Sequence, residues 1–245
     1  MGSSHRCKSG TLSAAMVLLV AGIIVLGGCH PPRAVPSYEF ITRYDRMSEE
    51  HDPLVSLVFV PEARRLGEYD GIVIGDVGVG ETWVESKEEA SGYARLFRIV
   101  LQKELRKLDR FGFVTLDTES YYASPEHAPA LLIEGLITRF DTGSGWKRYF
   151  SYYLWFLQSG ATDFQIEGRV VDAESGELVM EFVDRRRGIY NTVFGPYHKT
   201  FQDKFAMCLT ARDTAQCLAV FMGEGYDGIP AIAAADAAAR QDDRL

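Results

Sequence analysis

The feature of this sequence that most constrains its fold is an amphipathic stretch, Ser86 to Leu108, between two groups of β-like segments. Its apolar side chains recur at three- and four-residue intervals, so a helix places them on one stripe that must pack against another layer. Ser86 can cap the start of this helix, and Glu88 and Glu89 suit its first turn. The stripe consists of Ala90, Tyr93, Ala94, Phe97, Val100, Leu101, Leu105 and Leu108.

Short apolar or alternating segments on both sides of this helix predict β-strands. The last two form a predicted hairpin, because Gly176 in the connection 173–176 can adopt the left-handed conformation that the turn needs. Helical patterning returns at 197–209 and 214–222. This order predicts an α+β fold of mixed α/β layers, with a mixed β-sheet of about five strands, the long helix packed on it, and C-terminal helices. The β-like segments are 54–60, 69–79, 113–116, 130–140, 164–172 and 178–184.

The first 29 residues have the composition of a secretory leader. Arg6 and Lys8 precede an apolar run, 12–26, of the length expected for a signal-peptide core. The sequence Leu26-Gly27-Gly28-Cys29 resembles the lipobox of bacterial lipoproteins. That resemblance implies that residues 1–28 are a signal peptide and that Cys29 is lipidated, with palmitate among its acyl groups. It also implies a position on the outer membrane, facing the periplasm, because His30 replaces the aspartate that marks inner-membrane retention.

One alternative to a lipid anchor is a single membrane-spanning helix over 12–28, a run near the lower length limit for a span. After this leader, the sequence divides into a proline-containing linker (29–37), a single α/β periplasmic domain (38–228) and an alanine-rich tail (229–245).

The charge of the chain limits its partners. Without residues 1–28 it has 24 basic and 34 acidic residues, a formal charge of −10. A nucleic acid is therefore not an expected partner, since such binders present clustered basic surface. Adsorption to anionic lipid through the net charge is not expected either, so the acyl anchor at Cys29 must hold the chain to the membrane.

Two cysteines remain after Cys7 and Cys29 are set aside. In an oxidising compartment, Cys208 and Cys217 predict a disulfide that closes a short loop. The alternative is two reduced thiols on helices. No histidine lies near either thiol at ligand spacing, so no metal site is predicted.

Several segments together resemble a group of uncharacterised bacterial lipoproteins, defined as domains of unknown function. More distantly, the group resembles envelope lipoproteins with a TolB-N-terminal-like or curli-secretion-like α/β fold. The resemblance implies a location and a fold, and it supplies no catalytic residue. The segments that carry it are Arg43–Met47, Leu66–Ile74, the amphipathic helix, and the hairpin from Ile166 to Gly188.

The most unusual stretch after the leader is aromatic. Seven of the eleven residues from Trp146 to Phe156 are aromatic, and neither strand nor helix periodicity places them all on one side. Trp and Tyr suit protein interfaces and membrane interfaces, so this segment is a candidate contact with a partner or a membrane. The alternative is a long hairpin that folds back on the core. The candidate residues are Trp146, Tyr149, Tyr152, Tyr153, Trp155 and Phe156.

No hydrolase motif is present, and no cofactor is predicted. The glycine-rich stretch Gly75–Gly80 differs from nucleotide-binding fingerprints and predicts a tight loop. Four carboxylates on the predicted strands could converge as a pair, but solvent-facing charges are the preferred interpretation; they are Glu134, Asp163, Glu167 and Asp172. The expected function is thus a non-enzymatic binding module with an envelope protein partner. Alternatives are a lipid- or glycan-handling accessory lipoprotein and, least favoured, a hydrolase.

Overall fold

The computed structural model describes residues 33–47, 54–61, 68–124, 128–144, 147, 160–188 and 203–225. All of them belong to one compact unit, Pro32–Leu245. The predicted signal peptide, Cys29 and the six aromatic candidates from Trp146 to Phe156 lie outside the described residues. Within the described part, no helix has the length and apolar character needed to cross a bilayer.

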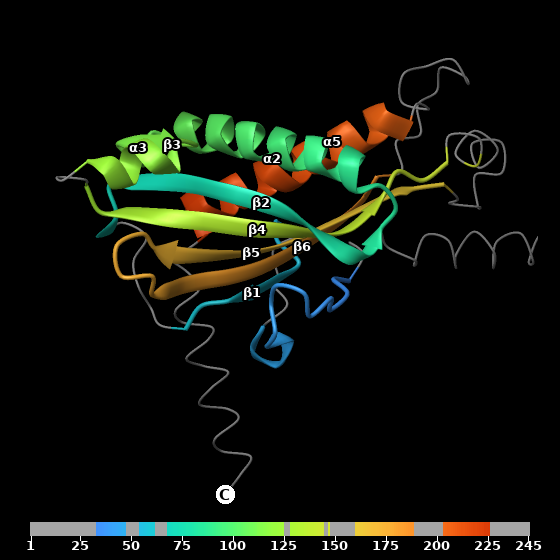
Figure 1. Cartoon of the computed structure of the whole chain (residues 1–245), viewed down its shortest axis with the longest axis horizontal. Helices are drawn as coiled ribbons and strands as arrows, with labels where there is room; N and C mark the ends of the chain where they lie inside the picture. Colours follow the sequence, from blue (N-terminus) through green and yellow to red (C-terminus); the bar gives the residue numbers. More distant parts are fainter. Residues whose placement is uncertain are drawn as a thin grey trace, which may run out of the picture. The chain divides into compact units, whose positions relative to one another are not determined.

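A six-stranded mixed sheet forms the centre of the fold, in the order β1-β6-β5-β4-β2-β3 (Figure 1). The strands β4, β5 and β6 pair antiparallel, whereas β2 runs parallel to both β4 and β3. This confirms the mixed α+β class, with one more strand than the predicted five. The strands are β1 (Leu57–Phe59), β2 (Gly71–Val84), β3 (Phe113–Thr115), β4 (Ala130–Asp141), β5 (Thr162–Asp172) and β6 (Leu178–Gly188).

Two helices, α2 (Lys87–Lys107) and α5 (Asp203–Val220), cover one face of this sheet (Figure 1). The predicted stripe of α2 faces the sheet, and Ser86 caps the helix by accepting a hydrogen bond from the Glu89 N–H at 3.3 Å. The large fully buried side chains between the layers include Phe97, Leu101, Phe140, Phe164 and Phe182. Burial of these apolar groups between helix and sheet is the main stabilisation of the fold.

The predicted hairpin is β5–β6, and its register is set by close packing at one point. Gly168 lies opposite Phe182, and a Cβ atom at position 168 would overlap the Phe182 ring. The turn contains Gly176 at φ +70°, and the Asp172 side chain accepts hydrogen bonds from the Glu174 and Ser175 N–H groups. The local turn chemistry and the cross-strand packing therefore specify the same pairing.

Two sequence-based expectations about local structure are wrong. Gly75–Gly80 is not a loop but part of β2, which continues to Val84 with irregular register against β4. The predicted break between two C-terminal helices is also absent, since α5 runs unbroken through residues 210–213 and is followed by a π-helical turn, Phe221–Gly225. The structure also contains two short helices, α3 (Thr118–Ala123) and the 3₁₀ turn Tyr44–Arg46, that the periodicity does not predict.

Cys208 and Cys217 do not form the predicted disulfide. Both lie on α5, nine residues apart along a continuous helix. At 1.5 Å per residue their Cα atoms are about 13.5 Å apart, whereas a disulfide needs a Cα separation below about 7 Å. The helix and the bridge therefore exclude each other, and the alternative of two thiols on a helix is the correct one.

Candidate functional site

The face of the sheet turned away from the helices has an unusual row of polar side chains on β5. Asp163, Gln165 and Glu167 alternate with Phe164 and Ile166, so they point away from the helical layer. These three polar residues are nevertheless 5%, 0% and 0% exposed. The sequence analysis predicts solvent-facing carboxylates at 163 and 167, and this prediction is wrong because residues 33–47 lie across them. We call residues 33–47 the strap.

Gln165 and Glu167 bind the main chain of the strap. The Gln165 side chain donates from Nε2 to the Val35 carbonyl at 2.7 Å, and its Oε1 accepts from the Val35 N–H at 2.8 Å. Glu167 accepts a hydrogen bond from the Ile41 N–H at 3.1 Å and another from the Ser37 hydroxyl. Since all of these donors and acceptors are partly or fully buried, each bond replaces hydration that burial removes.

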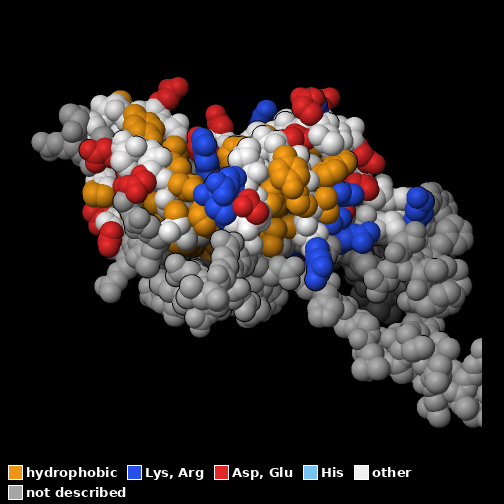
Figure 2. All heavy atoms as spheres, turned by 90° about the horizontal axis from the view of Figure 1, so that it is seen from below, with side chains coloured by type: hydrophobic (Ala, Val, Ile, Leu, Met, Phe, Trp, Pro, Cys, Tyr) orange, Lys and Arg blue, Asp and Glu red, His pale blue; other side chains and the backbone are white. Residues whose placement is uncertain are grey.

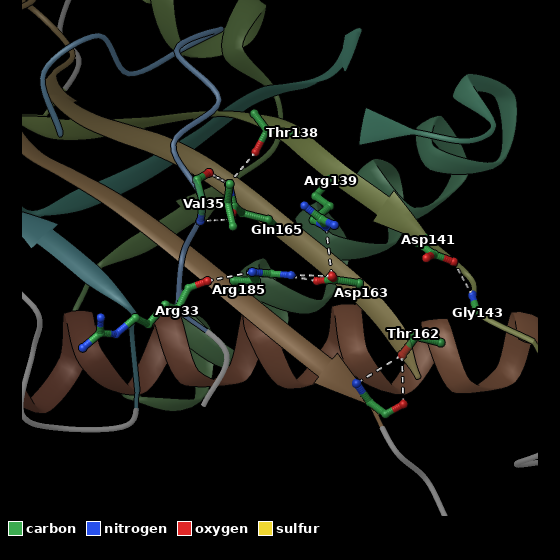
Figure 3. A network of polar contacts seen from close by, with 11 residues as sticks. Arg33, Val35, Thr138, Arg139, Asp141, Gly143, Thr162, Asp163, Gln165 and Arg185 are labelled. Carbon is green, nitrogen blue, oxygen red and sulfur yellow. Dashed lines mark hydrogen bonds and ion pairs between the residues drawn. The ribbon is translucent and has the colours of Figure 1, made fainter. Parts of the chain in front are cut away.

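Asp163 is the centre of a charged network at the end of the row (Figure 3). It accepts from Arg185 through both carboxylate oxygens, at 2.9 and 2.6 Å, and Arg139 Nε lies 2.9 Å from Oδ2. Arg185 also donates from Nη1 to the Arg33 carbonyl at 2.8 Å. The buried carboxylate thus orients the arginine that holds the first described residue of the strap.

A fourth attachment joins the strap to β2. The Glu39 carboxylate accepts hydrogen bonds from the Glu81 N–H at 2.7 Å and the Thr82 N–H at 2.9 Å. Burial acts to raise the pKa of Glu39, but the hydrogen bonds from Thr82 and Glu81, together with the charge of Lys87, outweigh it and lower the pKa. These N–H groups lie where the β2–β4 register is irregular, which leaves them available to a side chain.

Aromatic residues of the strap complete its contact with the sheet. The guanidinium of Arg169 on β5 stacks 5.4 Å from the centre of the Phe40 ring. Tyr44 packs edge-on against Tyr38. Burial, followed by its hydrogen bond with Glu167, raises the pKa of Tyr44, so this phenol stays neutral. The strap is therefore attached by apolar and polar contacts along most of its length.

The arrangement suits attachment better than acid–base chemistry. Both buried carboxylates on β5 already accept hydrogen bonds from protein donors. Asp163 and Glu167 are four residues apart on one strand, about 13 Å, which exceeds the separation of a glycosidase pair. The other two candidate carboxylates lie elsewhere, since Glu134 pairs with Arg169 at 2.7 Å and Asp172 accepts from the turn. No cluster of metal ligands occurs among the described residues.

Three basic residues on or just after α2 bind main-chain carbonyl groups. Arg98 donates to the Ile74 carbonyl and pairs with Asp76 at 2.8 Å, and Arg106 donates to the Val114 carbonyl at 2.7 Å. Arg110, just after the helix, donates to the Gly223 carbonyl at 2.6 Å. These contacts satisfy carbonyl groups at the edges of the sheet and at the C-terminal end of the helical layer.

Ser144 and Gly160, the described residues on either side of the aromatic segment, lie at the same end of the sheet as Asp163. Asp141 on β4 pairs with Asp163 on β5, and the Ser144 N–H donates to the Gly160 carbonyl at 3.3 Å beyond them. Gly143 adopts φ +70°, and a Cβ atom there would overlap the backbone at Gly160 and Ala161. The chain segments that follow β4 and precede β5 thus stay paired as far as Ser144 and Gly160.

Comparison with known proteins finds one family model that matches part of this chain. Residues 82–192, from the end of β2 past the end of β6, match the model of a domain of unknown function (DUF4410). No curated protein sequence matches the chain. This match supports the predicted resemblance to a domain of unknown function, while the relation to lipoproteins remains a prediction.

A search of solved structures found similar chains at low sequence identity. The PelC dodecamer from Paraburkholderia phytofirmans is 14% identical, covers 63% of this chain and 95% of its own, and has a TM-score of 0.37. Protein XCC0632 from Xanthomonas campestris is 9% identical, with coverages of 76% and 96% and a TM-score of 0.35. A neuraminyllactose-binding hemagglutinin homolog from Helicobacter pylori is 9% identical, with coverages of 67% and 91% and a TM-score of 0.35. The comparisons thus show that residues 82–192 are similar to a domain of unknown function.

Proposed function

We propose that this chain is a bacterial envelope lipoprotein, lipidated at Cys29 and facing the periplasm from the outer membrane. Its domain is a non-enzymatic binding module held close to the bilayer. The observation that carries this proposal is the attachment of the strap, which fixes the chain to the sheet from Arg33 onward. Only residues 30–32 separate Arg33 from Cys29. Even fully extended, the four steps from Cys29 to Arg33 span only about 14 Å.

A short tether changes what the anchor does. A long flexible linker would let the domain rotate freely above the membrane. Here the Asp163 end of the sheet stays within one tether length of the acylated residue. Each buried methylene contributes about 0.8 kcal/mol, so several acyl chains hold this end at the surface persistently.

The aromatic segment is the proposed partner contact. The flanking residues Ser144 and Gly160 lie at the same end of the sheet as Arg185, which binds the first residue of the strap. Trp and Tyr side chains combine apolar rings with polar tips and therefore suit a site at the bilayer surface. We place the envelope protein partner, and contact with the membrane interface, at Trp146, Tyr149, Tyr152, Tyr153, Trp155 and Phe156.

Membrane fractionation of the full chain tests the anchor. Cys29→Ser is expected to prevent acylation and move the protein out of the outer-membrane fraction, while the matched variant Cys208→Ser stays in it. Mass analysis of the amino-terminal peptide of the wild type is expected to show an acylated residue 29. An intact, unmodified amino terminus on the cellular protein would overturn the proposal.

Crosslinking in intact envelopes tests the binding role. Trp155→Ala is expected to lose the crosslinked partner without changing the melting temperature, and Trp83→Ala on β2 serves as the control outside the segment. If Trp155→Ala instead lowers the melting temperature and leaves crosslinking intact, the segment belongs to the core.

A further inference from the structure

Four arginines gather at the end of the sheet from which the chain leads to Cys29. Arg139 extends from β4, Arg185 and Arg187 from β6, and Arg33 begins the strap. Figure 3 shows Arg139 and Arg185 beside the β5 carboxylate of Asp163, whereas Arg33 meets Arg185 through its main-chain carbonyl and directs its guanidinium away from Asp163. Arg187 is the direct cross-strand partner of Asp163. We call these four residues the arginine end.

The positive charge of the arginine end is only partly neutralised. Arg139 and Arg185 share the single carboxylate of Asp163. Arg187 is exposed, and within the described part of the chain no carboxylate lies at ion-pair distance from it. Asp141 lies on β4 directly opposite Asp163, on the side away from β6, and its charge also acts on Glu85. The surplus charge is therefore concentrated on the side of β6, at Arg187.

Charged side chains are also unevenly distributed over the surface of this face. In Figure 2, which looks onto the face opposite the helices, blue side chains lie in the middle of the face and toward the end where β2 and β4 finish, whereas the other end carries red side chains. The whole chain, by contrast, has a formal charge of −8. Such an asymmetry has a consequence beside an anionic bilayer, because the positive end is attracted while the rest of the molecule is repelled.

We propose that the arginine end binds the phosphate groups of anionic phospholipids in the membrane that carries the anchor. The inference rests on the proposed function, since the tether from Cys29 is what brings Arg33 to within about 14 Å of the acyl chains. Guanidinium groups bind phosphate oxygens in a bidentate manner and are weakly hydrated, which favours them at a lipid surface. Lipid contact by this end would set the orientation of the whole domain, with the helical layer directed sideways or away from the membrane.

Vesicle sedimentation of a chain that lacks the anchor tests the proposal separately from acylation. The chain is Cys29–Leu245 with Cys29→Ser, which keeps every described contact because all of them lie within Pro32–Leu245. It is expected to bind phosphatidylglycerol-containing vesicles more strongly than pure phosphatidylcholine vesicles, and to lose the difference in high salt. Arg187→Gln is expected to weaken this binding about fivefold, and Arg187→Glu about 25-fold, given the usual gain per basic residue.

The matched control is Arg95→Gln, which removes an exposed arginine from α2 and is expected to leave vesicle binding unchanged. Equal binding to both kinds of vesicle, or wild-type binding by Arg187→Glu, would overturn the proposal. Tighter binding of polygalacturonate than of vesicles would assign the surface to an acidic glycan instead. If the shortened chain does not fold, phenylglyoxal labelling of the full chain in nanodiscs decides: Arg187 is expected to react more slowly than Arg95 only when phosphatidylglycerol is present. The mass of the amino-terminal peptide would show separately whether acylation fails. The vesicle experiment can be interpreted either way, because it uses a chain without the anchor.

Discussion

Gln165 holds Val35 by both polar groups of its main chain, with Nε2 donating to the carbonyl at 2.7 Å and Oε1 accepting from the N–H at 2.8 Å. A neighbouring strand would offer the same pair of bonds. A side chain thus takes the place of a strand and fixes the strap over a sheet face that would otherwise meet water. The Gln165 amide also donates to the Thr138 hydroxyl at 3.1 Å, which fixes its own orientation.

Gln165→Ala is expected to loosen the strap and lower the free energy of unfolding by about 2 kcal/mol, because the polar groups of Val35 lose their partner in a half-buried site. Limited proteolysis within 33–47 should become faster than in the wild type. Gln165→Glu is the informative comparison, since it keeps the acceptor for the Val35 N–H but cannot donate to the carbonyl when ionised. Unchanged proteolysis in both variants would show that the strap is held by its other contacts alone.

Asp163→Asn leaves the half-buried guanidinium groups of Arg139 and Arg185 beside a neutral group. Breaking a buried ion pair on one side costs about 3 kcal/mol, since the remaining charges keep their desolvation penalty. Asp45→Asn is the matched control, because Asp45 pairs with Arg43 at 3.5 Å with both side chains exposed. Exposed pairs contribute about 0–1 kcal/mol, so chemical denaturation should separate the two variants clearly. Equal losses for the two would contradict the buried network.

Elements with local signals were predictable from the sequence. The helix α2 was predictable because its cap and its apolar stripe both lie within one segment. The β5–β6 hairpin was predictable because the turn residues and the alternation of apolar and polar residues indicate the same pairing. The break expected near residue 212 is absent because the Thr210 hydroxyl lies 2.8 Å from that of Thr162, and Thr214 donates to the Thr210 carbonyl. These contacts allow polar residues in the interior of α5. One partner, Thr162, lies on β5, so the sequence pattern of the helix alone does not indicate this contact.

The strap was not predictable, because it has no periodicity and its bonds join residues far apart in sequence. Val35 and Gln165 are separated by 130 positions. Alternating polar residues such as Asp163, Gln165 and Glu167 are typical of a strand with one solvated face, and only the covering segment changes that interpretation. The one usable signal was the number of charged and amide residues on a single strand opposite three consecutive arginines, Arg185–Arg187.

Two glycine-to-alanine variants are expected to have opposite effects. At Gly168 a methyl group would overlap the ring of Phe182, which is fully buried and cannot move aside, so Gly168→Ala should destabilise by about 1–3 kcal/mol. At Gly92, on the exposed side of α2, a methyl group meets nothing within 4 Å. Gly92→Ala should therefore stabilise by about 0.5–1 kcal/mol through helix propensity. Denaturation midpoints in urea measure both, and a neutral Gly168→Ala would contradict the predicted packing.

Acidification is expected to weaken the Glu39 attachment. Because the pKa of Glu39 is lowered in the folded state, its contribution to stability is complete above the ordinary value of 4.5 and is lost as the pH falls through the lowered pKa. Glu39→Gln removes the titrating group, so the stability difference between wild type and variant should shrink between neutral pH and the acid range. A constant difference across this range would contradict a role for the ionised carboxylate.

The thiols of α5 provide a direct check on the helix itself. Since Cys208 and Cys217 lie nine residues apart on one helix, both are expected to be alkylated when the non-reduced chain is unfolded. The intact mass should show no 2 Da loss from a bridge, and a reductant should not change the melting temperature. Cys208→Ser and Cys217→Ser should each remove one alkylation site without affecting the other. A bridged Cys208–Cys217 peptide would require α5 to break between them, and with it the packing of Thr210 against Thr162.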